Sequence, residues 1–134
     1  MKVSSFLLSK EQVSYLASTI SMLEAAEHLE RHLYTAIPII DDHGKYIGTL
    51  SEGDLLWKMK RTPGLTFANM DQVPLSEVEQ RFQLESVQID AKMEDMLSLA
   101  ADQNFIPVVD KDGLFLGIIR RKDIIEYYNE SIMD

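Results

Sequence analysis

The chain has 134 residues, no cysteine, and 22 acidic against 13 basic residues, which gives a net charge of -9. This length fits one compact domain, and the lack of cysteine excludes a disulfide framework, a thiolate metal site and a cysteine nucleophile. The acidic balance disfavours nucleic acid as a partner, and the apolar run in residues 1–8 is too short for a signal peptide or a spanning helix. We therefore expect a cytoplasmic protein with no nucleic acid or membrane partner.

The first predicted element is an amphipathic helix that begins after Ser21. Ser21 and Glu24 have the spacing of a capping box. Apolar residues then follow at helical spacing along one face: Leu23, Ala26, Leu29 and Leu33. His28 and His32 lie four residues apart, on one face of this helix. Two imidazoles at this spacing can bind a metal, but no third ligand is evident, and the alternative is a solvated helix face.

A strand pair and a second helix come next in the chain. The apolar run at residues 36–40 ends in Asp-Asp-His-Gly, which is typical of a buried strand entering a tight turn. The following strand, at 46–50, contains Gly48, which indicates a bulge or a close backbone approach. Ser51 is placed to cap a helix that runs through Asp54 to Lys60, whose acidic first turn suits the helix dipole.

The middle of the chain has the composition of a linker. Thr62, Pro63 and Gly64 predict a turn, and residues 75–82 predict a short helix after Pro74. Residues 86–89 predict the strand that opens the next structural unit. We therefore divide the chain into a first repeat with the N-terminal segment at 1–62, a linker at 63–85 and a second repeat at 86–134.

The second half of the chain repeats the first at a constant offset of 69 positions. The run Ile37-Pro38-Ile39-Ile40-Asp41 recurs as Ile106-Pro107-Val108-Val109-Asp110, and Gly44, Gly48 and Asp54 recur as Gly113, Gly117 and Asp123. Asp90 is the predicted cap of the second amphipathic helix, and its predicted apolar positions are Met93, Met96, Leu97 and Ala100. Self-similarity at a fixed period indicates two copies of one supersecondary unit.

The two copies differ where the last helix begins. Arg120 stands in the place of Ser51, and Arg121 and Lys122 follow it. Three cations at a helix N-terminus are electrostatically unfavourable, and the arrangement becomes reasonable if an anion binds there. The alternative is that the cations are solvated and that the two aspartates of the repeat merely favour a first helical turn.

Catalytic motifs are absent or fail on spacing. Residues 48–53 read G-x-x-S-x-G, which has one residue too many for a nucleophile elbow. The sequence contains neither a P-loop nor a Rossmann glycine pattern. We therefore expect no enzyme activity, no cofactor and no metal.

These residues resemble the CBS (cystathionine-β-synthase) domain, and the two copies resemble a stand-alone Bateman module. The resemblance spans residues 7–128 and depends on two motifs, the I-P-[IV]-[IV]-D strand and the G-h-h-x-x-x-D run at 48–54 and 117–123. It implies an α/β fold of two β-α-β-β-α repeats with pseudo-twofold symmetry, packed through their sheets. It also implies a homodimer that forms through exposed helix faces.

The resemblance further implies that an adenine nucleotide binds in the cleft between the repeats. Asp54 and Asp123 would accept the ribose hydroxyls, and Ser51 would donate to a phosphate, a position that Arg120 takes in the second copy. This chemistry is sound because a carboxylate can accept two vicinal hydroxyls and a helix start can receive phosphate oxygens. The predicted nucleotide-binding residues are Tyr34, Thr35, Ala36, Ile37, Pro38, Ser51, Asp54, Phe105, Ile106, Pro107, Arg120, Arg121, Lys122 and Asp123.

The segment at residues 34–38, together with Arg121 and Lys122, is similar to small stand-alone members of the family that bind cyclic di-AMP. Tyr34 could stack on an adenine and Thr35 could read its edge, or Tyr34 could pack at a helix–strand corner. We match Tyr34 and Thr35 with Asn104 and Phe105 in the second copy, so we expect two sites of different affinity.

We therefore predict a regulatory protein that senses AMP, ADP, ATP or cyclic di-AMP and acts on an unknown effector protein. Because we find no effector domain in the sequence, the signal has to pass through a partner whose affinity depends on the bound ligand. The alternative hypothesis is a ligand-free module whose surface helices mediate dimerisation or protein interaction.

Overall fold

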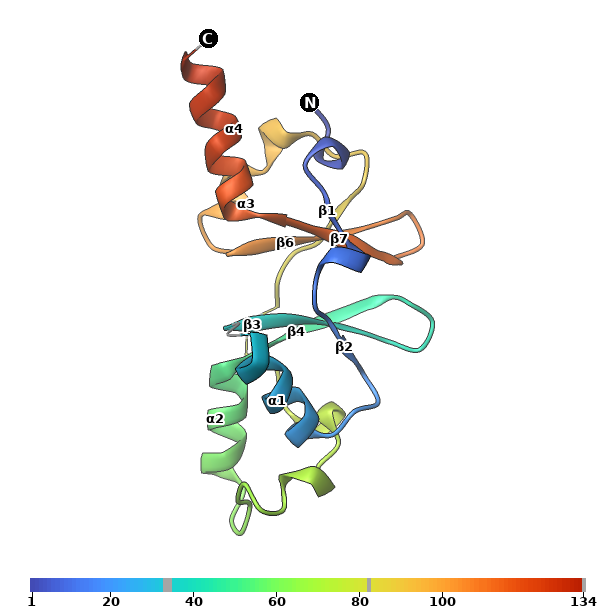
Figure 1. Cartoon of the computed structure of the whole chain (residues 1–134), viewed down its shortest axis with the longest axis vertical. Coiled ribbons are helices and arrows are strands. Elements are labelled where there is room, and N and C mark those ends of the chain that lie inside the picture. Colours follow the sequence, from blue (N-terminus) through green and yellow to red (C-terminus); the bar gives the residue numbers. More distant parts are fainter. Residues whose placement is uncertain (33–34, 82, 134) are drawn as a thin grey trace. The chain divides into compact units, whose positions relative to one another are not determined.

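A computed structural model of the chain describes residues 1–32, 35–81 and 83–133 (Figure 1). The chain forms two compact units, one made of Ser14–Gln83 and the other of Met1–Val13 together with Leu84–Asp134. We had grouped the N-terminal segment with the first repeat, but its first thirteen residues pack with the second. Each repeat therefore forms its own compact unit, and the second contains a segment from the beginning of the chain.

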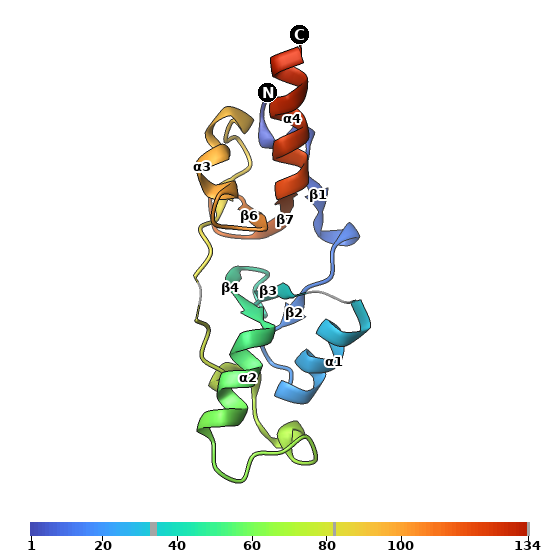
Figure 2. The ribbon, with the colours of Figure 1, turned by 90° about the vertical axis from the view of Figure 1, so that its left-hand side faces the viewer.

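The unit Ser14–Gln83 has the order strand, helix, strand, strand, helix. Its elements are β2 (Leu16–Ala17), α1 (Met22–His32), β3 (Ala36–Ile40), β4 (Tyr46–Ser51) and α2 (Glu52–Arg61), followed by single 3-10 turns at Met70–Gln72 and Leu75–Glu77. Strand β3 lies in the centre of the sheet, parallel to β2 and antiparallel to β4. Both helices cover one face of this sheet (Figure 2).

The other unit has the same order and one additional strand. Its elements are β1 (Leu8–Ser9), β5 (Val87–Gln88), α3 (Leu97–Ala100), β6 (Phe105–Val109), β7 (Phe115–Arg120) and α4 (Arg121–Met133), with 3-10 turns at Val3–Ser5, Lys10–Gln12 and Met93–Asp95. The sheet order is β1-β7-β6-β5, in which β5 is parallel to β6 and the other pairs are antiparallel. The predicted β-α-β-β-α repeat is confirmed in both halves.

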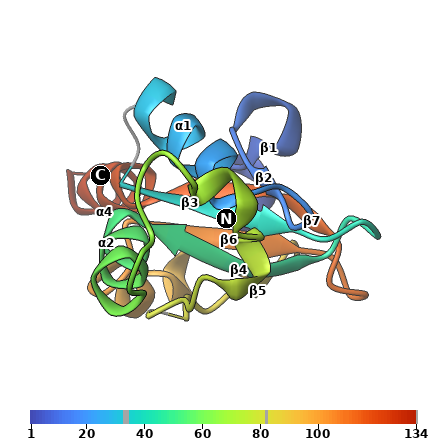
Figure 3. The same cartoon turned by 90° about the horizontal axis from the view of Figure 1, so that it is seen from below.

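An aspartate holds the hairpin turn of each repeat. Asp41 Oδ1 accepts hydrogen bonds from the N–H groups of His43 and Lys45, both at 2.9 Å, and Gly44 follows with a φ of 83°. The same arrangement recurs at Asp110, Asp112, Gly113 and Leu114. In both units the turn lies at the far end of the strands from the helix that follows them (Figure 3). Both predicted hairpins are confirmed.

Gly48 and Gly117 each lie beside a shift in strand register and against a segment from elsewhere in the chain. A Cβ at Gly117 would collide with the carbonyl oxygen of Leu8, and the φ of 154° at this residue also favours glycine. A Cβ at Gly48 would collide with the side-chain amide of Gln80. We predicted a bulge or a close backbone approach at these glycines: both lie beside a register shift, but only Gly117 is approached by backbone, since a side chain approaches Gly48.

Each unit has its own hydrophobic core between its sheet and its helices. The first core contains Leu16, Met22, Ala25, Leu29, Ile37, Ile39, Leu50, Met70, Leu75 and Val78. The second contains Val3, Met93, Met96, Ala100, Ile106, Val108, Ile119 and Ile124. Because Val3 is completely buried there, the N-terminal segment contributes to the second core as well as to the sheet.

Two predicted helix starts are confirmed and one is wrong. Ser21 precedes α1 and its Oγ accepts the N–H of Glu24 at 3.1 Å, and Ser51 caps α2. Asp90 was predicted to cap the helix of the second repeat, but that region begins as a 3-10 turn with Lys92 at the cap position and no side-chain cap. Leu33, the last residue of the predicted apolar stripe, lies outside the described residues.

Two further predictions about helices are wrong. Residues 75–82 do not form a helix, because only the 3-10 turn Leu75–Glu77 follows Pro74 before the chain continues without regular structure; Phe82 is outside the described residues. Leu97 was predicted to face the core, but its side chain is exposed. The regular helix in that region spans only the four residues Leu97–Ala100. It is too short to form the continuous apolar face that we predicted from a longer helix.

The longest helix that the structure describes is α4, with 13 residues. No helix in the described part of the chain is long and apolar enough to cross a membrane.

Glu94 connects the first segment of the second repeat to α4. Its Oε1 accepts a hydrogen bond from Tyr127 Oη at 2.6 Å and another from the amino group of Met1 at 2.9 Å. Its backbone carbonyl accepts a hydrogen bond from Tyr128 Oη at 2.5 Å. The hydrogen bond from Tyr127, followed by that from the amino group, lowers the pKa of the Glu94 carboxyl from 4.5 to about 2.

Tyr127→Phe should raise the pKa of Glu94 from about 2 toward 4.5, because it removes the strongest stabiliser of the ionised form. Since the folded-state pKa is the lower one, this carboxylate contributes stability above pH 4.5 that is lost as the pH falls toward 2. An NMR titration of Glu94 and unfolding curves over that pH range measure both effects. Tyr128→Phe is the control: it should lower stability at every pH without moving the pKa. A Glu94 pKa that stays at about 2 in Tyr127→Phe would contradict this assignment.

Candidate functional site

In the unit Ser14–Gln83, the start of β3 lies against the junction between β4 and α2. The carbonyl of Thr35 accepts the N–H of Glu52 at 3.0 Å, and Ala36 pairs with Ser51 across the two strands. Ser51 Oγ accepts the N–H of Asp54 at 3.3 Å, and Asp54 Oδ2 accepts the N–H of Ser51 at 2.8 Å. Four of the predicted site residues therefore meet at this junction.

The second unit forms the same junction between β6, β7 and α4. The carbonyl of Asn104 accepts the N–H of Arg121 at 2.9 Å, and Phe105 pairs with Arg120 across the strands. Asp123 Oδ2 accepts the N–H of Arg120 at 3.2 Å. The predicted residues of the second copy are therefore also brought together.

The matching hydrogen bonds correct the correspondence between the two copies. Thr35 matches Asn104, and Ala36 matches Phe105, so our pairing of Tyr34 and Thr35 with these residues is wrong by one position. The constant offset of 69 positions already gives the same correspondence, so the error was one of counting. Tyr34 itself lies outside the described residues.

The other predicted strand residues are buried. Ile37 and Ile106 are completely buried in the cores of their units, so their side chains face the helices of their own unit. Pro38 and Pro107 follow them on the strands and are also buried. These four residues shape the strand on which the junction is built.

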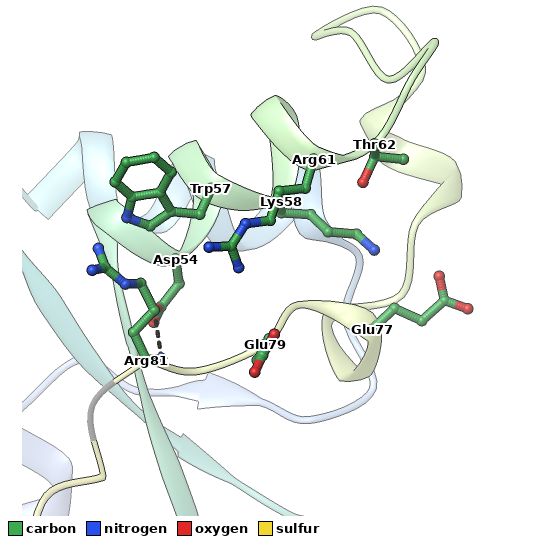
Figure 4. Close-up of a pocket in the computed structure, with 8 residues that line it drawn as sticks. All are labelled: Asp54, Trp57, Lys58, Arg61, Thr62, Glu77, Glu79 and Arg81. Carbon is green, nitrogen blue, oxygen red and sulfur yellow. Dashed lines mark hydrogen bonds between the residues drawn. The ribbon is translucent and has the colours of Figure 1, made fainter.

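Asp54 is almost completely buried, at 2% exposure, and both of its oxygens accept backbone N–H groups. Oδ2 accepts from Ser51, and Oδ1 accepts from Arg81 at 2.9 Å (Figure 4). Next to this contact, Gln80 Oε1 accepts the N–H of Thr49 at 3.1 Å. Residues of the predicted G-h-h-x-x-x-D motif therefore fix the chain segment that leaves the first repeat.

A groove of about 210 Å³ lies between α2 and this segment (Figure 4). Trp57 and Arg61 line it on the helix, and Glu79 and Arg81 line it on the opposite side. The guanidinium of Arg81 lies 5.0 Å from the Trp57 ring centroid, and Arg61 and Lys60 lie near the same ring. Trp57 could have been found in the sequence, since it lies one turn after Asp54, but nothing local indicates Arg81.

Asp123 has a different partner, the side chain of Arg120. Arg120 Nε donates to Oδ2 and Nη2 donates to Oδ1, both at 3.0 Å. The hydrogen bonds that the Arg120 guanidinium donates to Asp123 are the main reason that the pKa of Arg120 is raised. Arg120 and Asp123 are three residues apart, a spacing that was visible in the sequence. We had expected either a bound anion or solvent as the partner of Arg120, and the structure instead pairs it with Asp123.

The other two cations at the start of α4 have different environments. Arg121 Nε donates to the carbonyl of Ala100 at 2.8 Å, which joins α4 to α3. Lys122 is exposed. The three cations therefore do not form one cluster aimed at an anion, although Arg120 and Lys122 both present charge to solvent at this junction.

The two histidines of α1 stack on each other, with 6.1 Å between the ring centroids of His28 and His32. Among the residues that the structure describes, no three His, Asp or Glu side chains form a group that could hold a metal ion. The third ligand that the sequence lacked is therefore not supplied by the described part of the fold.

Two β-α-β-β-α units with equivalent strand–helix junctions define a tandem-repeat α/β module. The family model for the CBS domain matches the chain twice, over residues 3–61 and 75–130. The chain belongs to the CBS domain family, and its tandem pair is a Bateman module.

Three known proteins illustrate this relationship. The chain is 27% identical, over an alignment of 146 positions, to the chloroplastic CBS domain-containing protein CBSX1 of Arabidopsis thaliana; the match covers 92% of this chain and 62% of that protein, which is less than two thirds of its length. The structure is similar to CbpB in complex with c-di-AMP, with a TM-score of 0.86, 24% identity, and coverage of 100% of this chain and 88% of that chain. It is also similar to CBSX2 in complex with AMP, with a TM-score of 0.68, 24% identity and 96% coverage of each chain.

Asp54→Ala should lower the free energy of unfolding by more than Asp123→Ala does. The first change leaves two backbone N–H groups without their acceptor, at a cost of about 1–3 kcal/mol for each group that stays buried. The second leaves one such N–H and a guanidinium that water can reach, since 41% of the Arg120 side chain is exposed. Urea unfolding of the two variants measures the difference, and equal losses would show that the contact to Arg81 contributes nothing.

Proposed function

We propose that this protein is a regulatory sensor of an adenine nucleotide, either AMP, ADP, ATP or cyclic di-AMP, and that it is not an enzyme. The observation that carries the proposal is the paired strand–helix junction, which in each repeat unites a carboxylate, a helix start and the beginning of a strand. The complexes of CbpB with c-di-AMP and of CBSX2 with AMP support it, because both proteins share the fold.

The chemistry of each junction suits one part of a nucleotide. The carboxylates of Asp54 and Asp123 are acceptors for ribose hydroxyls. Ser51 in the first repeat, and Arg120 with Lys122 in the second, are donors for phosphate oxygens. Ala36 and Phe105 begin the strands along which the base would lie, and Thr35 and Asn104 precede them. Tyr34, which is outside the described residues, stays a predicted stacking partner.

The first junction also offers a route for a signal. Oδ1 of Asp54 accepts the N–H of Arg81, and a ribose hydroxyl that donates to the same oxygen would share this acceptor. This shared acceptor is the proposed coupling between binding and the position of residues 77–81. Trp57, the single tryptophan of the chain, is in contact with Arg81 and should report this coupling through its fluorescence. An effector protein that contacts the groove beside Trp57 would then distinguish the bound from the free state.

Adenine nucleotides should raise the melting temperature and bind in calorimetry, because a ligand at about 100 times its dissociation constant adds about 2.7 kcal/mol to the stability. Asp123→Asn should weaken binding by about 1–3 kcal/mol, since it removes a charged acceptor. Asp110→Asn is the matched control: it changes a carboxylate of the same unit in the hairpin turn and should leave binding unchanged. If none of the four nucleotides binds, the ligand-free interaction module becomes the better hypothesis.

We also propose that the protein forms a homodimer through the outer faces of its helices. Leu56 on α2 and Ile125 on α4 occupy equivalent positions of the two repeats, and their side chains are 61% and 48% exposed. Single exposed apolar side chains are common on protein surfaces, so the support for this proposal is their repetition at one position of both copies. A second copy of the chain presents the same two residues and can satisfy both surfaces.

The double variant Leu56→Glu, Ile125→Glu should convert the dimer to a monomer, because it places carboxylates in the proposed interface. Light scattering after size-exclusion chromatography measures the mass directly. Phe67→Glu is the control, since Phe67 is 76% exposed but lies outside the helices. A monomeric wild-type protein, or a double variant that remains dimeric, would rule out this interface.

A further inference from the structure

The two junctions differ most in how their aspartates are engaged. In the first, Ser51 contributes its hydroxyl to the helix cap and leaves the carboxylate of Asp54 to backbone N–H groups. In the second, one guanidinium takes both oxygens of Asp123, through Nε to Oδ2 and Nη2 to Oδ1, each at 3.0 Å. The acceptor that the second junction would offer to a ribose is therefore already covered by a side chain.

The hydrogen-bonding capacity of Asp123 shows how complete this cover is. Oδ2 accepts two hydrogen bonds, from the N–H and the Nε of Arg120, and Oδ1 accepts one from Nη2. A carboxylate oxygen has two lone pairs, so only Oδ1 has capacity left. Only 11% of the Asp123 side chain is exposed, so a vicinal diol cannot engage both oxygens while Arg120 stays in place.

Arg120 is free to leave without damage to the core. Its side chain is 41% exposed, so water can solvate the guanidinium when it moves. Its backbone N–H is held by Asp123 independently of the guanidinium, so the start of α4 keeps that hydrogen bond when the side chain moves. Arg121, by contrast, is tied to Ala100 and cannot replace it easily.

We propose that Arg120 is a specificity-determining residue that makes the second repeat selective for phosphorylated ligands. A neutral nucleoside has no anionic group that could replace Asp123 as the acceptor for the guanidinium of Arg120. A phosphate offers it a bidentate anionic partner of comparable strength, which draws Arg120 away and exposes both oxygens of Asp123 to the ribose. This inference rests on the proposed nucleotide-binding function and adds to it a reason for the arginine at the position of Ser51.

Binding of adenosine and of AMP to the wild-type protein and to Arg120→Ser tests this inference. The variant installs the residue of the first repeat, and serine is a favourable helix cap, so folding should be preserved. Calorimetry measures the affinities, and amide chemical shifts of Asp123 against those of Asp54 show which repeat binds. We expect wild-type protein to bind AMP at the second repeat but adenosine at least about tenfold more weakly, and Arg120→Ser to bind adenosine there about tenfold more tightly than wild type.

Lys122→Ser is the matched control, because it removes one positive charge from the same helix start without touching Asp123. It should weaken AMP binding slightly and produce no gain for adenosine. If Arg120→Ser weakens AMP and leaves adenosine unchanged, as Lys122→Ser does, Arg120 is a simple phosphate ligand and the selectivity role is wrong. If neither adenosine nor AMP binds to wild type or to Arg120→Ser while ADP, ATP or cyclic di-AMP does bind, this inference fails and the nucleotide function stands. If none of the four nucleotides binds, both fail together.

Discussion

In each repeat, a carboxylate in the first turn of a helix accepts the N–H of the residue that ends the preceding strand. Asp54 does this for Ser51 at 2.8 Å and Asp123 does it for Arg120 at 3.2 Å. A chain that passes directly from a strand to a helix leaves backbone donors without partners, and this contact satisfies one of them. The carbonyls of Thr35 and Asn104 accept the next donors of each helix, so the first long strand, the second strand and the helix are fixed at one point. The proposed ligand chemistry depends on this convergence.

The two equivalent junctions differ in the hydrogen-bond donor that the second oxygen of each aspartate accepts. In the first repeat that oxygen accepts the N–H of Arg81 and so fixes the segment that follows the repeat. In the second it accepts the guanidinium of Arg120. The two repeats therefore share one backbone scaffold but differ chemically. The carboxylate of Asp54 binds the backbone of Arg81, whereas the carboxylate of Asp123 is covered by the side chain of Arg120.

Gly48 and Gly117 also occupy equivalent positions in the two repeats and contact different segments. Gly48 receives the side chain of Gln80, and Gly117 receives the backbone of Leu8, which begins the additional strand of the second sheet. In both units a residue without a Cβ admits a segment that is not part of the β-α-β-β-α element order. The contacts at Gly48 and Asp54 together explain why residues 80 and 81 run along the first repeat without regular secondary structure of their own.

The sequence by itself determined the two repeats, their hairpins and the caps at Ser21 and Ser51, because each of these depends on residues a few positions apart and on a constant offset between copies. Only the tertiary structure decided that the N-terminal segment belongs to the second unit, that a single 3-10 turn stands where we predicted a helix after Pro74, and that Asp54 binds the N–H of Arg81. Those outcomes depend on which distant segment fills a groove or satisfies a buried oxygen. Periodicity and capping patterns carry no information about such partners, since the partner is selected by packing and hydrogen bonding across the folded unit.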